Sequence, residues 1–114
     1  HKRKFITVAL KGSQTMSQMC DVIMENYKLE HEDLYSFFMN NKSFDRDYEI
    51  PCPAEINSDF TADIVKLYEL RLIVGQRFLL VYNFDKKITF EIEFLGVEPL
   101  QKGEEYPRIV ASQK

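Results

Sequence analysis

The chain has 114 residues, a formal net charge of −3, a hydrophobic fraction of 45% and a charged fraction of 29%. This length fits one domain, and the composition is typical of a folded globular protein and argues against disorder. Acidic and basic residues are balanced along the chain, which disfavours non-specific binding to nucleic acid. The apolar runs are much shorter than a membrane span requires. We therefore expect one cytoplasmic domain over residues 1–114, with residues 1–3 as a flexible terminus.

The first part of the chain predicts a strand followed by an amphipathic helix. Residues 4–10 are rich in residues that favour strands. Thr15 and Gln18 have the spacing of a capping box, which satisfies free N–H groups at a helix start. A helix over residues 16–27 follows, because its apolar residues recur at helical spacing and form one stripe. The residues of this stripe are Met16, Met19, Cys20, Ile23, Met24 and Tyr27.

The middle of the chain is less regular. Residues 34–39 predict a second strand, and residues 42–63 predict a long irregular segment that contains two prolines. Residues 64–72 are ambiguous, because they fit either one helical turn or the end of a longer helix. We therefore leave both interpretations open for that segment.

The last part of the chain predicts three more strands. Residues 77–84 form the first, and residues 88–97 alternate apolar and polar side chains as a half-buried antiparallel strand does. Gly96 suggests a bulge near the end of this strand. Residues 107–111 form the last short strand. One helix and several antiparallel strands predict an α+β fold, with the sheet packed on the helix.

The sequence contains no clear catalytic or metal-binding signature. Cys20 lies on the apolar stripe and is expected to be buried, whereas Cys52 lies between two prolines in a predicted loop. His31 stands beside several carboxylates, but a metal site needs more converging ligands than one histidine. We interpret it as a solvated loop residue. The sequence therefore predicts no enzyme activity and no cofactor.

Several segments resemble the plasmid pRiA4b open-reading-frame-3 family. The residues that carry the resemblance are the first-helix pattern at 15–23, the strand at 34–38, the segment Val74 to Phe84 and the late motif Tyr106-Pro107-Arg108. The resemblance extends, in order, over most of residues 4–111. It implies an α/β-roll, in which an antiparallel, ubiquitin-roll-like sheet packs on one main helix. It also implies an association with plasmids and insertion elements.

The chain departs from this family at one motif. Where the family has an acidic turn followed by Trp and His, this chain has Lys86, Lys87, Ile88 and Phe90. Such a carboxylate and imidazole group could serve in metal or acid–base chemistry, and these substitutions remove it. The resemblance therefore implies the fold more directly than any activity.

Lys86, Lys87 and Arg108 are the candidate partner-binding residues, since we expect them near one rim of the sheet. The leading hypothesis is a non-catalytic protein-interaction domain that binds an unidentified protein through a sheet edge or through residues 42–63. The alternative is a nucleic-acid-binding accessory protein that uses Lys2 to Lys4 together with the two lysines of the turn. Under both hypotheses, lysines at a turn also have a simpler explanation, which is that they form part of the solvated surface.

Overall fold

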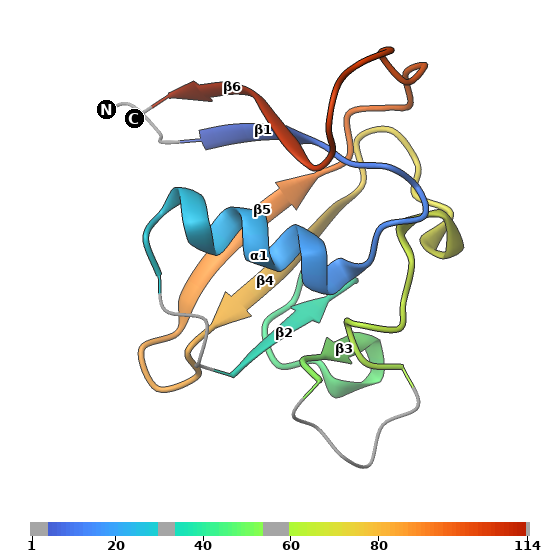
Figure 1. Cartoon of the computed structure of the whole chain (residues 1–114). Coiled ribbons are helices and arrows are strands. Elements are labelled where there is room, and N and C mark those ends of the chain that lie inside the picture. The colour runs from blue at the N-terminus through green and yellow to red at the C-terminus, as the bar shows by residue number, and fades with distance from the viewer. Residues whose placement is uncertain (1–4, 30–33, 54–59, 114) are drawn as a thin grey trace.

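A computed structural model describes residues 5–29, 34–53 and 60–113, and it shows an α+β fold with one main helix and two antiparallel sheets (Figure 1). The predicted fold class is confirmed, although the strands form two sheets. In chain order the elements are β1 (Phe5–Ala9), α1 (Met16–Asn26), β2 (Tyr35–Phe38), η1 (Arg46–Tyr48), β3 (Glu49–Pro51), η2 (Leu67–Leu70), β4 (Arg77–Tyr82), β5 (Ile88–Glu93) and β6 (Arg108–Gln113).

Helix α1 begins as the sequence predicts. The Thr15 side chain accepts a hydrogen bond from the Gln18 main-chain N–H, and the Gln18 side chain accepts one from the Thr15 N–H, which completes the capping box. The helix buries its apolar stripe and leaves the opposite side to solvent. The buried residues of α1 are Met16, Met19, Cys20, Ile23 and Met24.

The larger sheet has the strand order β3-β2-β4-β5, and all its neighbours are antiparallel. Side chains alternate between its two faces. Phe37, Phe78 and Leu80 lie on the inner face, where they join the buried helix residues in one hydrophobic core. Ser36 and Val81 are equally buried but lie on the opposite face, which we call the outer face.

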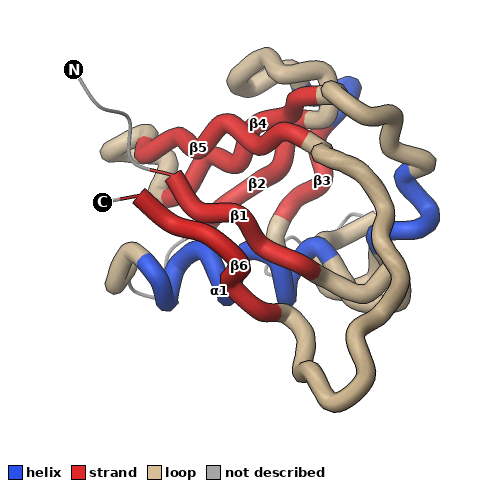
Figure 2. Tube along the Cα trace, turned by 90° about the horizontal axis from the view of Figure 1, so that it is seen from above, coloured by secondary structure: helices blue, strands red, loops and turns tan. Residues whose placement is uncertain are grey.

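The smaller sheet is a ribbon of β1 and β6, which bring the two ends of the described chain together. Figure 2 shows this ribbon lying over the space between α1 and the larger sheet. Ile6 of β1 packs against the main core, whereas Ile109 and Val110 of β6 are exposed. The register shifts between Thr7 and Val8, which places a bulge in this ribbon.

A second, smaller aromatic cluster covers part of the outer face. The Phe44 ring lies 5.5 Å from the Phe38 ring and 5.7 Å from the Phe84 ring, measured between centroids. Within residues 40–47 the Asn40 amide donates a 2.7 Å hydrogen bond to Asp45. Phe44 itself has a φ of +61°, which is an uncommon conformation for a bulky side chain. The loop thus folds back onto the sheet.

Two predictions for the loops and strand ends need correction. The segment 42–63 was expected to be irregular, but it contains η1 and β3, and β3 pairs with β2. Cys52 lies in a loop after β3, as expected, and its side chain is buried. Strand β5 ends at Glu93 and not at residue 97, so Gly96 lies outside any strand and forms no bulge.

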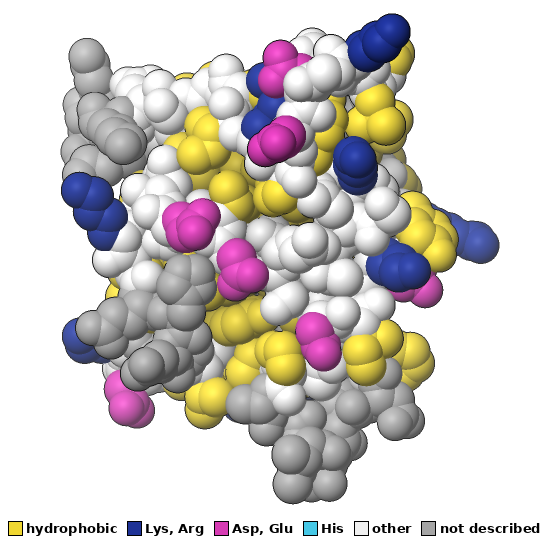
Figure 3. All heavy atoms as spheres, in the orientation of Figure 1, with side chains coloured by type: hydrophobic (Ala, Val, Ile, Leu, Met, Phe, Trp, Pro, Cys, Tyr) yellow, Lys and Arg dark blue, Asp and Glu magenta, His cyan; other side chains and the backbone are white. Residues whose placement is uncertain are grey.

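The ambiguous segment 64–72 contains a single short helical turn, η2. The predicted strand at 107–111 is confirmed and extends to Gln113. The basic residues 2–4, His31 and the proposed flexible terminus lie outside the described residues. In the described part of the chain no helix is long and apolar enough to cross a membrane. On the side seen in Figure 3, acidic and basic side chains are dispersed among apolar ones.

Candidate binding site

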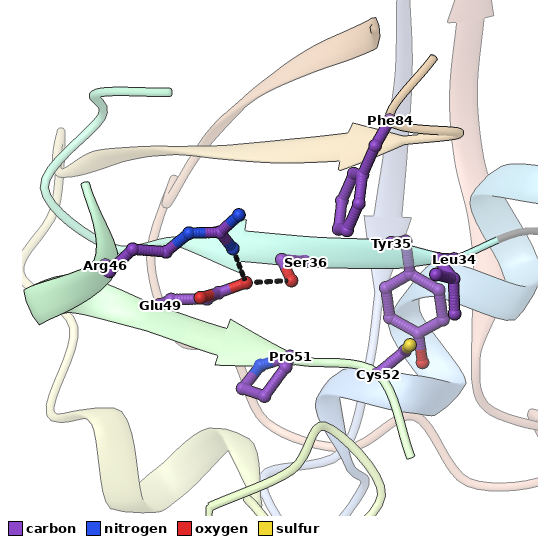
Figure 4. A pocket seen from close by; sticks show the side chains of 8 residues that line it. All are labelled: Leu34, Tyr35, Ser36, Arg46, Glu49, Pro51, Cys52 and Phe84. Carbon is purple, nitrogen blue, oxygen red and sulfur yellow. Dashed lines mark hydrogen bonds and ion pairs between the residues drawn. The ribbon is translucent and has the colours of Figure 1, made fainter. Parts of the chain in front are cut away.

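A pocket of about 350 Å³ opens on the outer face, where β2 and β3 run beside each other. Its size lies at the lower end of the range for small-ligand pockets. Figure 4 shows that its walls come from β2, β3, η1 and the segment that follows β4. The described residues that line it are Leu34, Tyr35, Ser36, Arg46, Glu49, Pro51, Cys52 and Phe84.

One carboxylate oxygen joins the polar side chains of this pocket. The Ser36 hydroxyl donates to Glu49 Oε2 at 2.5 Å, and Arg46 Nη1 donates to the same oxygen at 2.6 Å (Figure 4). Ser36 is 1% exposed, while the Arg46 side chain is 59% exposed and that of Glu49 is 15% exposed. These three side chains are therefore linked in a row, from the buried Ser36 through Glu49 to the exposed cation Arg46.

Aromatic rings also hold Arg46 in place. Its guanidinium carbon lies 5.4 Å from the centre of the Phe44 ring and 6.0 Å from that of Phe84. These distances are within the range of cation–π attraction. Arg46 is thus positioned both by a carboxylate and by two rings, and the two supports are independent. Among the described residues, Nη1 is the only guanidinium nitrogen of Arg46 that is hydrogen-bonded.

The structure places Lys87 near the Phe44 ring, and Lys86 precedes it in the same turn. Both are exposed in the turn between β4 and β5, where the Lys86 main-chain N–H donates to Asn83 Oδ1 at 3.2 Å. Lys87 Nζ lies 6.0 Å from the centre of the Phe44 ring, which is the ring that Arg46 also contacts. We call Arg46, Lys86 and Lys87 the cationic rim of the pocket.

Arg108 does not belong to this rim. It lies on β6, in the two-stranded sheet, while the two lysines follow a strand of the larger sheet. Figure 1 shows the β4–β5 turn and the start of β6 at opposite ends of the fold. The Arg108 guanidinium donates a 2.9 Å hydrogen bond to Gln101 and lies 5.9 Å from the Tyr106 ring. Its Nε atom is buried and has no hydrogen-bond partner among the described residues.

The polar groups of the pocket fix one another in place. The Ser36 hydroxyl donates a hydrogen bond to Glu49 Oε2, which also accepts one from Arg46. His1 and His31 both lie outside the described residues. The described residues contain no group of three His, Cys, Asp or Glu side chains that could hold a metal ion.

Two titratable groups of the core have shifted pKa values, and one of them, Tyr35, also lines the pocket. Burial raises the pKa of the Cys20 thiol, and the nearby Asp21 and Cys52 raise it further. Burial also raises the pKa of Tyr35, although its 2.9 Å hydrogen bond with Ser17 opposes the shift. Both groups stay protonated at neutral pH. Cys20 is therefore a poor nucleophile, since the thiolate is the reactive form.

The sequence singled out the two lysines of the turn as candidates, but it did not indicate Arg46, Ser36 or Glu49. These three residues lie on segments that meet only when residues 40–47 fold over the sheet. One signal was present, because Phe44 interrupts an otherwise polar loop between Asn40 and Asp47. An aromatic residue in such a segment indicates that it packs against something.

Comparison with known proteins yields one match. The family model described as plasmid pRiA4b ORF-3-like protein matches residues 5–114, which is nearly the whole chain. No curated protein and no solved structure matches. The resemblance that the sequence motifs indicated is confirmed over the range that those motifs cover.

Proposed function

The chain belongs to the plasmid pRiA4b ORF-3-like family, and we propose that it is a non-catalytic protein-interaction domain that binds an acidic segment of a partner protein on its outer face. The family description connects it to a plasmid reading frame, and an origin in a mobile element is part of the proposal. Two free cysteines, Cys20 and Cys52, accord with a reducing compartment such as the cytoplasm.

The observation that carries this proposal is the convergence of two cations on one ring. Arg46 and Lys87 come from segments about forty residues apart, yet both lie within cation–π distance of Phe44, at 5.4 Å and 6.0 Å. Exposed cations around a hollow raise the local concentration of acidic groups and guide their approach. Asp85, in the same turn, offsets part of this charge.

The walls of the pocket suit an extended peptide. Leu34, Pro51 and Phe84 supply apolar surface, and the guanidinium of Arg46 supplies planar donors that match a carboxylate. Apolar walls with a few fixed polar groups are typical of binding pockets. A segment that combines acidic and apolar side chains therefore complements both parts of the site.

Nucleic acid is the competing ligand, because cations interleaved with aromatic rings also suit single strands. The size of the rim favours a protein segment. The rim is small compared with a groove that follows a phosphate backbone.

A crosslinking pull-down from nuclease-treated lysate of the source cells tests the proposal. The baits are the wild-type protein, the Lys86→Glu/Lys87→Glu variant and the Lys11→Glu/Lys102→Glu variant. The last variant is the matched control, because Lys11 and Lys102 are also exposed and lie outside the rim. It changes the net charge by the same amount. We expect the wild type and the control variant to capture a protein with an acidic segment, and we expect the rim variant to fail to capture it.

Two other outcomes overturn the proposal. If the rim variant and the control capture the same proteins as the wild type, the rim is not the binding surface. If the wild type captures protein only before nuclease treatment, and binds oligothymidylate with a steep salt dependence, nucleic acid is the ligand.

A further inference from the structure

We infer that Glu49 occupies the place of the partner's carboxylate on Arg46, so that the protein carries an internal competitor for its own ligand. This inference rests on the proposed function, because it specifies how the same pocket takes an acidic group. It assigns the chemical class of the anchoring group, a carboxylate, and it assigns Arg46 as the residue that binds it.

The first step is the geometry of the pair. Arg46 Nη1 and Glu49 Oε2 are 2.6 Å apart, which is the distance of a strong charge-assisted hydrogen bond. The pair lies at the pocket, where the Arg46 side chain is 59% exposed. An incoming carboxylate can reach this guanidinium directly from solvent. The Glu49 side chain is only 15% exposed, so the exchange of one carboxylate for another takes place at the exposed guanidinium.

The second step is that each member of the pair keeps a partner after the exchange. Glu49 Oε2 still accepts the Ser36 hydroxyl, which approaches it at 2.5 Å from the buried sheet. Arg46 still lies over the rings of Phe44 and Phe84. Neither charge is left buried and alone, which is the usual cost of breaking an ion pair. The guanidinium is therefore pre-positioned whether or not Glu49 holds it.

The third step concerns the electrostatics of the ligand. A carboxylate that binds Arg46 comes close to Glu49, and two like charges at that distance repel each other. Lys86 and Lys87 attract the same ligand from the rim. Glu49 thus lowers the affinity that the rim alone would give. It limits binding to ligands that bring more than one negative charge or a well-fitting apolar group.

The test is a gain of affinity, which misfolding does not mimic. A fluorescein-labelled oligoglutamate peptide is titrated with wild-type protein and with Glu49→Gln, and binding is followed by fluorescence anisotropy. Gln keeps an oxygen that can accept the Ser36 hydroxyl while it removes the charge. We expect Glu49→Gln to bind the peptide about tenfold more tightly, which corresponds to a change of about 1.4 kcal/mol in the binding free energy.

Three further variants and an uncharged peptide make the gain specific. Glu104→Gln removes the same charge at an exposed site outside the pocket and should leave the affinity within about twofold, because exposed charges at a distance are screened by salt. Arg46→Gln should weaken binding, and the Arg46→Gln/Glu49→Gln double variant should show none of the gain. Oligoglutamine, which is uncharged, should bind none of the proteins.

The outcomes separate the inference from the proposed function. If wild-type protein binds oligoglutamate through Arg46 but Glu49→Gln gains no more than Glu104→Gln, the inference is wrong and the proposed function stands. The inference is also wrong if the double variant keeps the gain. If neither wild-type protein nor Glu49→Gln binds oligoglutamate, both the inference and the proposed function are overturned.

Discussion

Ser36 donates its hydroxyl proton to Glu49 across the β2–β3 edge of the sheet, over a distance of 2.5 Å. The serine is 1% exposed, and its side chain lies on the outer face of β2, whose other residues are all aromatic. A buried hydroxyl needs a hydrogen-bond partner, because an unmatched one costs free energy. Glu49 therefore has a structural role, as the hydrogen-bond partner of Ser36, as well as the proposed role in binding.

The structural role of Glu49 predicts that substitutions of Ser36 and of Glu49 lower the stability by unequal amounts. Ser36→Ala should lower the free energy of unfolding by about 1 kcal/mol, because Glu49 keeps Arg46 as a partner. Glu49→Ala leaves the hydroxyl buried and unmatched, and should cost about 1–3 kcal/mol. Urea denaturation measures both. The double variant should cost less than the sum of the single variants, and strict additivity would show that the two side chains are not coupled.

The packing of the larger sheet predicts that two leucines differ strongly in their contribution to the stability of the protein. Leu80 is fully buried on the inner face, while Leu95 is 63% exposed just beyond β5. Leu80→Ala should destabilise the protein by about 2–5 kcal/mol, because it leaves a cavity in the main core. Leu95→Ala should change the stability by less than about 0.5 kcal/mol. Comparable losses in thermal denaturation would contradict the described packing.

Phe44 is expected to fix the loop that carries Arg46. Its ring contacts Phe38 and Phe84 and lies under both Arg46 and Lys87. Phe44→Ala should release residues 40–47 from the sheet, and their amide hydrogen exchange should become faster. The exchange of β4 and β5 should hardly change. If residues 40–47 exchange at the wild-type rate, another contact holds the loop.

The buried thiol predicts a loss of stability at alkaline pH. The pKa of Cys20 is raised in the folded protein, so the unfolded chain loses this proton first, from about its ordinary value of 9.0 upward. Stability from this group is complete below that pH. It then falls by up to about 1.4 kcal/mol for each further pH unit. Tyr35 adds to the loss above its ordinary value of 10.0.

Urea denaturation at neutral and alkaline pH checks this sign. Cys20→Ala should lose less stability between the two conditions than the wild type does, whatever its stability at neutral pH. Equal losses would mean that the thiol ionises as readily in the folded protein as in the unfolded chain.

Much of the fold followed from local patterns in the sequence. The stripe on α1 and the capping box at Thr15 gave the helix to within one residue, because both depend on neighbours a few positions away. The alternation in β5 likewise gave its buried face. The three-residue strand β3 was missed, because it is too short for a pattern and is defined by its pairing with β2.

The pocket was harder to predict for the same reason. Ser36 is an ordinary polar residue in an apolar strand, and Arg46 and Glu49 are ordinary charges in a polar loop. Only the fold brings these three side chains to one point. Lys86 and Lys87 were singled out because a pair of lysines in a turn is visible in the sequence, whereas the contact of Lys87 with Phe44 was not predicted.

The proposed binding face is tested most directly by mapping where an acidic peptide contacts the protein. Unlabelled oligoglutamate is titrated into ¹⁵N-labelled protein, and amide chemical shifts are followed by NMR. We predict that the largest shifts occur in residues 34–36, 44–49 and 84–87, which surround the pocket and its rim. Shifts confined to β6 and Arg108, or spread evenly over the exposed surface, would contradict the assignment of the outer face as the binding site.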